Sequence, residues 1–338
     1  MDGALPGDRV SARIVKTKKG YAEAQTDSIL AASPHRVEPK CAQFGPCGGC
    51  ALQDLAYEEQ LRQKEEQVRQ VLARVGRQSD IIVEPIVPSP DLWRYRNKMD
   101  MTFGYGDEGQ TVLGMHRRGQ FASIVDITEC WLQPESFDRA VEVTRRFARQ
   151  SGIPPYDPKT HKGCWRHLIL RHSVAQNAMM AVLITAGSVR PDVEALVEEL
   201  RKADTGLAGF VWATNDSVAD VASAQRIQYE WGEKALRERL GDLEFRVSPM
   251  SFFQVNTRAT ELLYSCVKEF IMPSEAVVLL DAYCGTGTIG IYCARGFGHV
   301  LGIDSVRDAV WDARQNAAIN NLRNCRFICG QVKRKVAL

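Results

Sequence analysis

The stretch "AVVLLDAYCGTGTIGIYCA", residues 276–294, decides the fold of this chain. It combines a continuous apolar run, typical of a buried strand, with a Gly-x-Gly turn and an apolar helical segment. The following residues repeat the alternation, with a strand in "HVLGID" (299–304), a helix in "SVRDAVWDARQNAAINN" (305–321) and a strand in "CRFICG" (325–330). Alternating strands and helices predict a parallel, doubly wound α/β sheet.

The turn in this stretch has the features of a nucleotide-type pocket. Asp281 ends the first strand, Gly285 lies in the turn, and Asp304 ends the next strand, where a carboxylate can accept hydrogen bonds from a ribose diol. The turn lacks a third glycine at dinucleotide spacing, and no Gly-Lys-Ser/Thr follows it. This pattern favours S-adenosylmethionine over a dinucleotide or a P-loop nucleotide, with a purely structural glycine turn as the alternative.

The preceding sequence has a different organisation. Residues 1–40 alternate apolar and polar side chains around a Lys-Lys-Gly turn, which predicts a small antiparallel unit. Residues 41–76 carry clustered cysteines and then a helix from about Leu55 to Val75, capped by Gly76. Residues 77–245 hold strand pairs around turns and predict a β-rich domain with some helix, and residues 246–338 form the α/β part.

Composition narrows the classes of function. The chain has 338 residues, of which 45% are hydrophobic and 25% charged, and a net charge of +2. This mild charge permits a nucleic-acid partner without requiring one. No apolar run approaches the roughly 18 residues of a membrane span, and the first residues lack the layout of a signal peptide. We therefore expect no membrane association and an intracellular location, in the cytoplasm or an organelle, where the ten cysteines stay reduced.

Three cysteines form the second chemical motif. Cys41, Cys47 and Cys50 lie within ten residues, with two glycines between the last two. Thiolates at this spacing can converge on one metal centre, and the glycines allow the backbone to bend round it. Spacing alone leaves zinc and an iron-sulfur cluster both open. Cys130, in "VDITECWLQP", is the best-placed candidate for a fourth ligand.

Five separated segments carry a family resemblance. They resemble the RNA uracil-5-methyltransferases that modify ribosomal RNA or the T-loop of transfer RNA, and most of all the cluster-bearing ribosomal branch. The segments are "CAQFGPCGGCALQDLAYEEQL", "YRNKMDMTFG", "GMHRRGQF", "SPMSFFQVNTRATELLY" and "LLDAYCGTGTIGIYCA". The resemblance implies a class I, Rossmann-like methyltransferase domain, a mixed β-rich central domain with an iron-sulfur site, and a partial OB-like TRAM domain at residues 1–40.

The resemblance also implies ligands and partners. The four cysteines match the ligands of a four-iron four-sulfur cluster, with Cys130 as the fourth. Gln254 matches a residue that contacts cofactor or target uracil. The other cofactor-binding positions are Asp281, Tyr283, Gly285, Thr288 and Asp304. Thr288 and Asp304 stand where relatives often have Asn and Glu, and both can still accept hydrogen bonds. The implied partner is RNA, and the full-length family is implied to be monomeric.

The family's chemistry needs two further residues. A Cys thiolate attacks carbon 6 of uracil, carbon 5 takes the methyl group, and a Glu removes the proton from carbon 5. The resemblance places both residues in C-terminal segments that follow a fourth strand, so no catalytic residue is expected within this chain. The remaining cysteines are better explained as small buried residues or lack a visible activating partner: Cys164, Cys266, Cys284, Cys293, Cys325 and Cys329.

The last residues, "QVKRKVAL" (331–338), are basic where the family continues with an acidic stretch. We therefore expect that family sequence stops near Gln331, that the methyltransferase domain is truncated, and that the chain alone is inactive. A three-stranded sheet should leave apolar surface uncovered and an edge bare. The alternative function is that of a catalytically inactive RNA-binding iron-sulfur protein.

Overall fold

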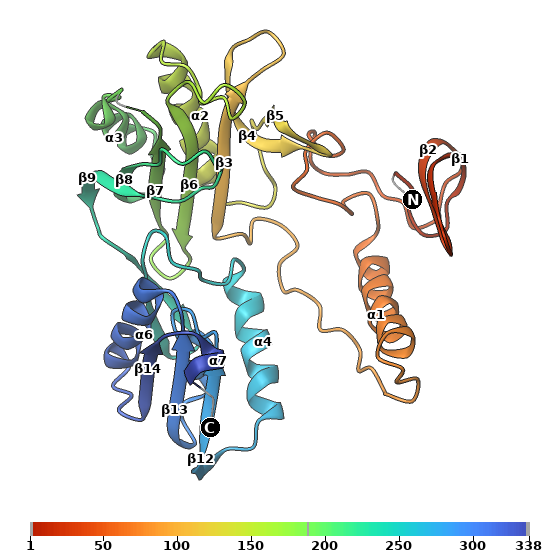
Figure 1. Cartoon of the computed structure of the whole chain (residues 1–338), viewed down its shortest axis with the longest axis vertical. Coiled ribbons are helices and arrows are strands. Elements are labelled where there is room, and N and C mark those ends of the chain that lie inside the picture. Colours follow the sequence, from red (N-terminus) through yellow and green to blue (C-terminus); the bar gives the residue numbers. More distant parts are fainter. Residues whose placement is uncertain (1–2, 188, 336–338) are drawn as a thin grey trace. The chain divides into compact units, whose positions relative to one another are not determined.

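The computed structural model describes residues 3–187 and 189–335, without the side chains of residues 275, 276, 334 and 335. The chain divides into two compact units, with the division between Pro88 and Ser89 (Figure 1).

The first unit contains a hairpin and a helix. Strands β1 (Arg9–Lys18) and β2 (Tyr21–Ala31) pair antiparallel around a turn in which Gly20 has a φ of 97°. Helix α1 (Tyr57–Arg74) carries two glutamates in its first turn, where their negative charges interact favourably with the positive end of the helix dipole. The Gly76 amide donates to the Val71 carbonyl at 3.1 Å and so caps the helix end. The predicted hairpin and helix are both confirmed.

Ion pairs hold the middle of this unit together. The Asp8 carboxylate is fully buried and accepts hydrogen bonds from the amides of Leu5 (2.7 Å) and Ser33 (2.8 Å). It also accepts hydrogen bonds from Nε (2.9 Å) and Nη2 (2.6 Å) of Arg36. The third guanidinium nitrogen, Nη1, donates to Asp54 at 2.7 Å. The Arg36 guanidinium holds the pKa of Asp8 well below its usual range. Asp8 therefore ties the start of the chain to the segment after β2.

Asp8→Asn is expected to make the Leu5 and Ser33 amides exchange faster, with a loss of about 2 kcal/mol of local stability, because hydrogen bonds to a charged group are lost. The pKa of Asp8 is lower in the folded chain than in the unfolded chain, where it is about 3.9. Asp8 therefore stabilises the fold at pH values above about 3.9, and this stabilisation is lost as the pH falls toward the pKa of the folded state. The difference between variant and wild type should therefore shrink below about pH 4. Hydrogen exchange at several pH values measures it.

The matched control is Asp27→Asn, in the same unit. Asp27 pairs with Arg13 at 3.6 Å, and both side chains are about half exposed or more. Such a surface pair contributes about 0–1 kcal/mol. Equal effects of the two substitutions would contradict the role assigned to Asp8.

The second unit begins with a seven-stranded sheet in the order β5-β4-β3-β6-β7-β8-β9. All neighbours are antiparallel except β7 and β8, which run parallel and are joined by a helical crossover. The strands are β3 (Lys98–Tyr105), β4 (Thr111–Arg117), β5 (Gln120–Asp126), β6 (Trp165–Ser173), β7 (Ala178–Thr185), β8 (Leu207–Thr214) and β9 (Arg226–Gly232). The predicted strand pairs on either side of "GDEG" and "VAQN" are confirmed.

Both faces of the sheet centre are covered. Helices α2 (Glu135–Gln150) and α3 (Val193–Lys202) contact each other and the sheet, and bury Phe137, Val141 and Leu196. On the opposite face, Ala222 and Ala224 pack over a cluster that includes Ile169 and Val182. Because β7 is buried on both sides, its sequence is a nearly continuous apolar run, whereas β6 also buries the polar side chains of Arg166, His167 and Arg171.

A second, smaller α/β layer follows. The hairpin of β10 (Leu236–Leu240) and β11 (Leu243–Val247) precedes helix α4 (Thr257–Phe270). Three parallel strands in the order β12-β13-β14 then alternate with helices, as the sequence predicts. The elements are β12 (Ser274–Ala282), α5 (Thr288–Cys293), β13 (Phe297–Asp304), α6 (Arg307–Ile319), β14 (Cys325–Cys329) and α7 (Val332–Lys335) (Figure 1).

Apolar side chains are exposed along β12 and near its start. Phe270 and Met272 are 84% and 88% exposed, and Val278 is 55% exposed. The expected uncovered apolar surface is therefore present on this edge strand. Within the described ranges, no helix has both the length and the apolar character needed to cross a membrane.

Candidate functional site

The turn between β12 and α5 builds the centre of the site. Tyr283, Gly285 and Gly287 all have positive φ values, of 63°, 52° and 77°. Gly287 is the N-cap of α5, and a Cβ added there would lie 2.8 Å from the Phe327 ring and 2.9 Å from the Ala313 side chain. The left-handed backbone and this close packing both require glycine at 287.

Two carboxylates shape this turn. Asp304 Oδ2 accepts the Gly285 amide at 2.9 Å, and Asp304 Oδ1 accepts the Val306 amide at 2.8 Å. Asp281 Oδ2 accepts the Gly290 amide of α5 at 2.9 Å. Burial raises the pKa of Asp281, the Gly290 hydrogen bond opposes that rise, and the Asp304 charge adds to it. The carboxyl ends of β12 and β13 therefore place both acidic groups beside the glycine turn.

Tyr264 lies beside this turn. Its hydroxyl lies 2.9 Å from Thr288 Oγ1. Burial raises the pKa of Tyr264, which is 1% exposed, and the side chains of Thr288 and Gln254 both act to lower that pKa. No sequence signal marks Tyr264 as a site residue, because a tyrosine on an apolar helix face resembles an ordinary core residue.

The predicted cofactor positions lie around one turn. Asp304 accepts the Gly285 amide, Asp281 accepts the Gly290 amide two residues after Thr288, and the Thr288 hydroxyl contacts Tyr264, whose pKa the Gln254 side chain acts to lower. Tyr283 lies in the same turn and is 77% exposed, so its ring is accessible to a ligand. The arrangement offers carboxylate, hydroxyl and backbone groups at the carboxyl edge of a parallel sheet, which is where ligands bind in such folds.

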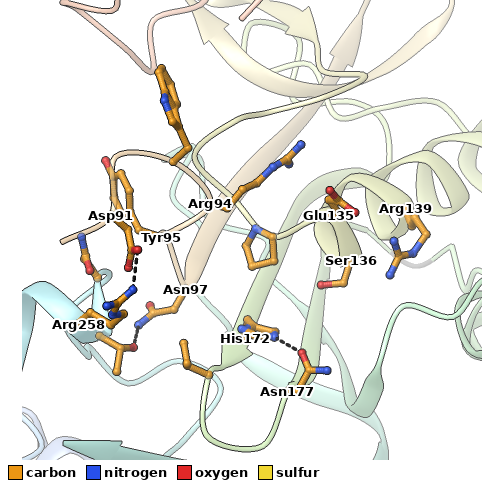
Figure 2. A pocket seen from close by; sticks show the side chains of 15 residues that line it. Asp91, Arg94, Tyr95, Asn97, Glu135, Ser136, Arg139, His172, Asn177 and Arg258 are labelled. Carbon is orange, nitrogen blue, oxygen red and sulfur yellow. Dashed lines mark hydrogen bonds and ion pairs between the residues drawn. The ribbon is translucent and has the colours of Figure 1, made fainter. Parts of the chain in front are cut away.

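An open pocket of about 530 Å³ lies elsewhere in the second unit. Figure 2 shows Arg94 and Tyr95 from the chain before β3, Arg139 from α2 and Arg258 from α4 around it. His172 and Asn177, joined by a hydrogen bond of 3.3 Å, complete one wall. Burial lowers the pKa of His172. The pocket is lined by Asp91, Trp93, Arg94, Tyr95, Asn97, Pro134, Glu135, Ser136, Arg139, His172, Val174, Asn177, Asn256, Thr257 and Arg258.

The arginines of this pocket differ in how fully they are engaged. Arg94 donates to Asp138 (2.6 Å), to Glu129 (2.9 Å) and to two carbonyls, and is therefore structural. Arg139 donates to the Asp204 carbonyl, which carries no net charge. The helices α2 and α4 both begin at the pocket, which adds the positive ends of two helix dipoles. The lining also holds the carboxylates of Glu135 and of Asp91, which pairs with Arg258 at 2.7 Å, so Arg139 and the two helix ends are the groups that favour an anionic ligand.

The three clustered cysteines lie in one tight loop of the first unit. The Phe44 amide donates to the Cys41 carbonyl (3.0 Å), the Cys47 amide donates to the Gln43 carbonyl (2.9 Å), and Gly45 has a φ of 95°. The Gly49 amide donates to Cys47 Sγ at 3.4 Å. Amide-to-sulfur hydrogen bonds and soft thiol donors are the environment of an iron-sulfur cluster, so the loop chemistry fits that group.

Cys130 belongs to the second unit. Asp138, held by Arg94, fixes its backbone by accepting the Cys130 amide at 2.9 Å. Across the part of the chain that the structure describes, no three His, Cys, Asp or Glu side chains are gathered as a metal site.

The other cysteines differ in exposure. Burial raises the pKa of Cys164 and of Cys325 to about 11 and that of Cys284 to about 12, and it also raises the pKa of Cys293. A thiol with a raised pKa is a poor nucleophile at neutral pH. The prediction that Cys329 is buried is wrong. It is exposed because it ends β14, an edge strand that pairs only with β13 among the described residues.

Comparison with known proteins defines the class of this fold and site. Residues 273–336 match the family model described as a methyltransferase domain. A tRNA (uracil-54, C5)-methyltransferase from Pyrococcus abyssi, solved with S-adenosyl-L-homocysteine, is 30% identical, with a TM-score of 0.76 over 97% of this chain and 73% of that one. The second unit therefore carries a class I, S-adenosylmethionine-dependent methyltransferase fold.

Sequence relatives narrow the class to a family. An uncharacterized RNA methyltransferase from Halalkalibacterium halodurans is 36% identical over 98% of this chain and 72% of its own length. A second one, from Caldanaerobacter subterraneus, is 38% identical over 99% of this chain and 74% of its own length. The chain belongs to the RNA methyltransferase family.

Proposed function

We propose that this protein is part of the machinery that methylates carbon 5 of uridine in ribosomal or transfer RNA. One observation carries the proposal. The Tyr264 hydroxyl lies 2.9 Å from Thr288 Oγ1 beside the glycine turn, and the Gln254 side chain acts to lower the pKa of the same tyrosine, so a residue matched to uracil contact acts on the group that adjoins the cofactor turn. The likeness to a tRNA (uracil-54, C5)-methyltransferase supports the choice of uracil.

S-Adenosylmethionine supplies an electrophilic methyl group when it is bound. The residues of this chain would orient it: Asp304, at the carboxyl end of β13, would accept hydrogen bonds from the ribose hydroxyls, and the positive-φ turn at residues 283–287 would allow close approach of the backbone. Gln254 presents a side-chain amide, which can both donate to and accept from the edge of a uracil turned out of its stack.

The reaction then needs a thiolate and a base. The thiolate adds to carbon 6, the electron pair displaced from the carbon 5–carbon 6 bond takes the methyl group, and the base removes the carbon 5 proton as the carbon–sulfur bond breaks. Cys164, Cys284 and Cys325 do not fit the thiolate role, because burial raises their pKa. Cys329 is exposed, and its Sγ lies 3.7 Å from the Ser305 carbonyl oxygen. We propose that the nucleophile and base lie outside residues 1–338.

Methyl-tritiated S-adenosylmethionine and unmodified RNA test this function. Ultraviolet irradiation should label the protein, because the cofactor turn binds the label, whereas residues 1–338 alone should form no 5-methyluridine. Labelled 5-methyluridine would place the nucleophile inside this chain, and a different labelled nucleoside would overturn the uracil-5 assignment. An unlabelled protein would overturn the cofactor site.

We further propose that RNA phosphate enters the pocket of Figure 2. Arg139→Gln should weaken RNA binding and lower the slope of log Kd against log salt by about one, as expected for one lost phosphate contact. Arg146→Gln is the matched control, because Arg146 lies on the same helix, pairs with Glu199 at 3.0 Å and does not line the pocket. A filter-binding titration at several salt concentrations measures both. Equal slopes for both variants would contradict the assignment.

The clustered cysteines are proposed as an iron-sulfur site. We propose that Cys41, Cys47, Cys50 and Cys130 bind a four-iron four-sulfur cluster, supported by the thiol donors and the amide-to-sulfur bond at Cys47. Protein purified without oxygen should contain about four irons and absorb broadly in the visible range. Cys47→Ser should lose both signals, whereas Cys266→Ser should keep them. Bound zinc without iron would contradict the cluster.

A further inference from the structure

Helix α6 and its C-cap residue carry three polar side chains on one stripe. Asp312, Asn316 and Asn320 are spaced four residues apart and therefore share one helix face. Asp312 is 1% exposed and Asn316 is fully buried. Buried polar groups are costly unless they are hydrogen-bonded, so the partners of this stripe show what it does.

Two of the three side chains bind the backbone of β11 as a neighbouring strand would. Asn316 Oδ1 accepts the Arg246 amide at 2.7 Å, and its Nδ2 donates to the Arg246 carbonyl at 3.3 Å. Asn320 does the same for Glu244, with distances of 2.9 Å and 2.6 Å. The helix thus fixes the register of the strand that leads to the segment 248–256.

Asp312 binds side chains of the segment 248–256 directly. Its carboxylate accepts Arg246 Nη1 at 2.6 Å, Ser248 Oγ at 2.8 Å and Ser251 Oγ at 2.5 Å. Arg171 of β6 donates to the Ser251 carbonyl from the other side. Ser248 and Ser251 are therefore both held by one carboxylate of α6.

Asn316 also reaches the cofactor turn. Its Nδ2 donates to the Thr286 carbonyl at 3.1 Å, and Thr286 Oγ1 donates to the Phe252 carbonyl at 3.4 Å. A shift of the turn on ligand binding would move these two bonds. Of the three stripe residues, Asn316 is the one whose hydrogen bonds join the turn to β11.

The far end of the segment is held next to the pocket. Asn97 Nδ2 donates to the Gln254 carbonyl at 2.9 Å, and the Asn97 amide donates to the Val255 carbonyl at 2.8 Å. Asn97 also lines the pocket of Figure 2. The segment 248–256 is therefore held by α6 at one end and by Asn97 at the other, with Gln254 near the second end.

We propose that Asn316, with Asp312, is a positioning residue that couples ligand binding at the turn 283–288 to the conformation of the segment 248–256. The inference rests on the proposed function in one respect, namely that the turn binds the cofactor. Coupling of this kind is reciprocal, so an ordered segment would also favour the bound ligand.

Hydrogen exchange with and without S-adenosyl-L-homocysteine tests the coupling. In the wild-type chain the ligand should slow exchange in both 283–288 and 248–256, by about fivefold or more in the second segment. Asn316→Asp keeps the acceptor for the Arg246 amide and loses the donor to the Arg246 and Thr286 carbonyls. It should retain slowing at 283–288 and lose it at 248–256. The matched control is Asn320→Asp, which changes the same stripe away from the turn and should behave as wild type.

Each other outcome overturns part of this inference. Slowing confined to 283–288 in the wild-type chain would leave the cofactor site intact and overturn the coupling. Loss of slowing at 248–256 in both variants would overturn the special role of Asn316. Absence of slowing in every segment would overturn the proposed cofactor site and the coupling with it. If Asn316→Asp does not fold, Asp312→Asn provides a second variant of equal size, in which exchange at 248–251 should be faster and less responsive to ligand.

Discussion

Gly287→Ala should lower the free energy of unfolding of the second unit by about 3 kcal/mol and abolish binding of S-adenosyl-L-homocysteine. The alanine would occupy a left-handed conformation, at a cost of about 1 kcal/mol, and would add roughly 2 kcal/mol of overpacking. The overpacking follows from the Phe327 ring and the Ala313 side chain, at 2.8 Å and 2.9 Å from the added Cβ. Chemical denaturation and titration calorimetry measure the two effects.

Gly285→Ala separates the free-energy cost of the left-handed backbone from the cost of overpacking. Gly285 also has a positive φ, of 52°, but an added Cβ there would have no protein neighbour within 4 Å. Its stability cost should therefore be only about 1 kcal/mol. Equal losses of stability at 285 and 287 would contradict the packing explanation.

Asp304→Ala should weaken binding of S-adenosyl-L-homocysteine on the order of tenfold to a hundredfold. This is the range expected when hydrogen bonds to a charged group are lost. The carboxylate also orders the turn through the amides of Gly285 and Val306, so its removal loosens the pocket as well as deleting a contact. Titration calorimetry at neutral pH measures the change in Kd.

Two companion variants sharpen this test. Asp304→Asn keeps one side-chain oxygen and should fall between wild type and alanine. Asp308→Ala removes an exposed carboxylate from the first turn of α6 and should leave the affinity unchanged. An Asp304→Ala protein that binds as tightly as wild type would remove Asp304 from the site.

Local sequence patterns predicted the elements of this fold well. The run from β12 to β14 follows the apolar strands and the glycine turn, and the hairpins β3–β4 and β6–β7 of the large sheet follow their turn residues. Asn256 is of a residue type that favours helix N-caps, and its side chain accepts the Ala259 amide at 3.0 Å at the start of α4. Each of these features depends on residues close together in the sequence.

Contacts between residues far apart in the sequence could not be predicted from local patterns. The hydrogen bond of Tyr264 to Thr288 joins residues on different helices, and the stripe of Asp312, Asn316 and Asn320 binds a strand about 70 residues earlier. The spacing of four residues in that stripe was visible, yet a polar helix face usually faces solvent. The exposure of Cys329 likewise depends on which strands lie beside β14.

The most direct test of the central claim is titration calorimetry of S-adenosylmethionine into the wild-type chain and the Gly287→Ala variant. One site per chain should be seen in the wild type, displaced by S-adenosyl-L-homocysteine, and none in the variant. Absence of binding to a folded wild-type chain, or equal binding to both proteins, would contradict a cofactor site at the turn 283–288.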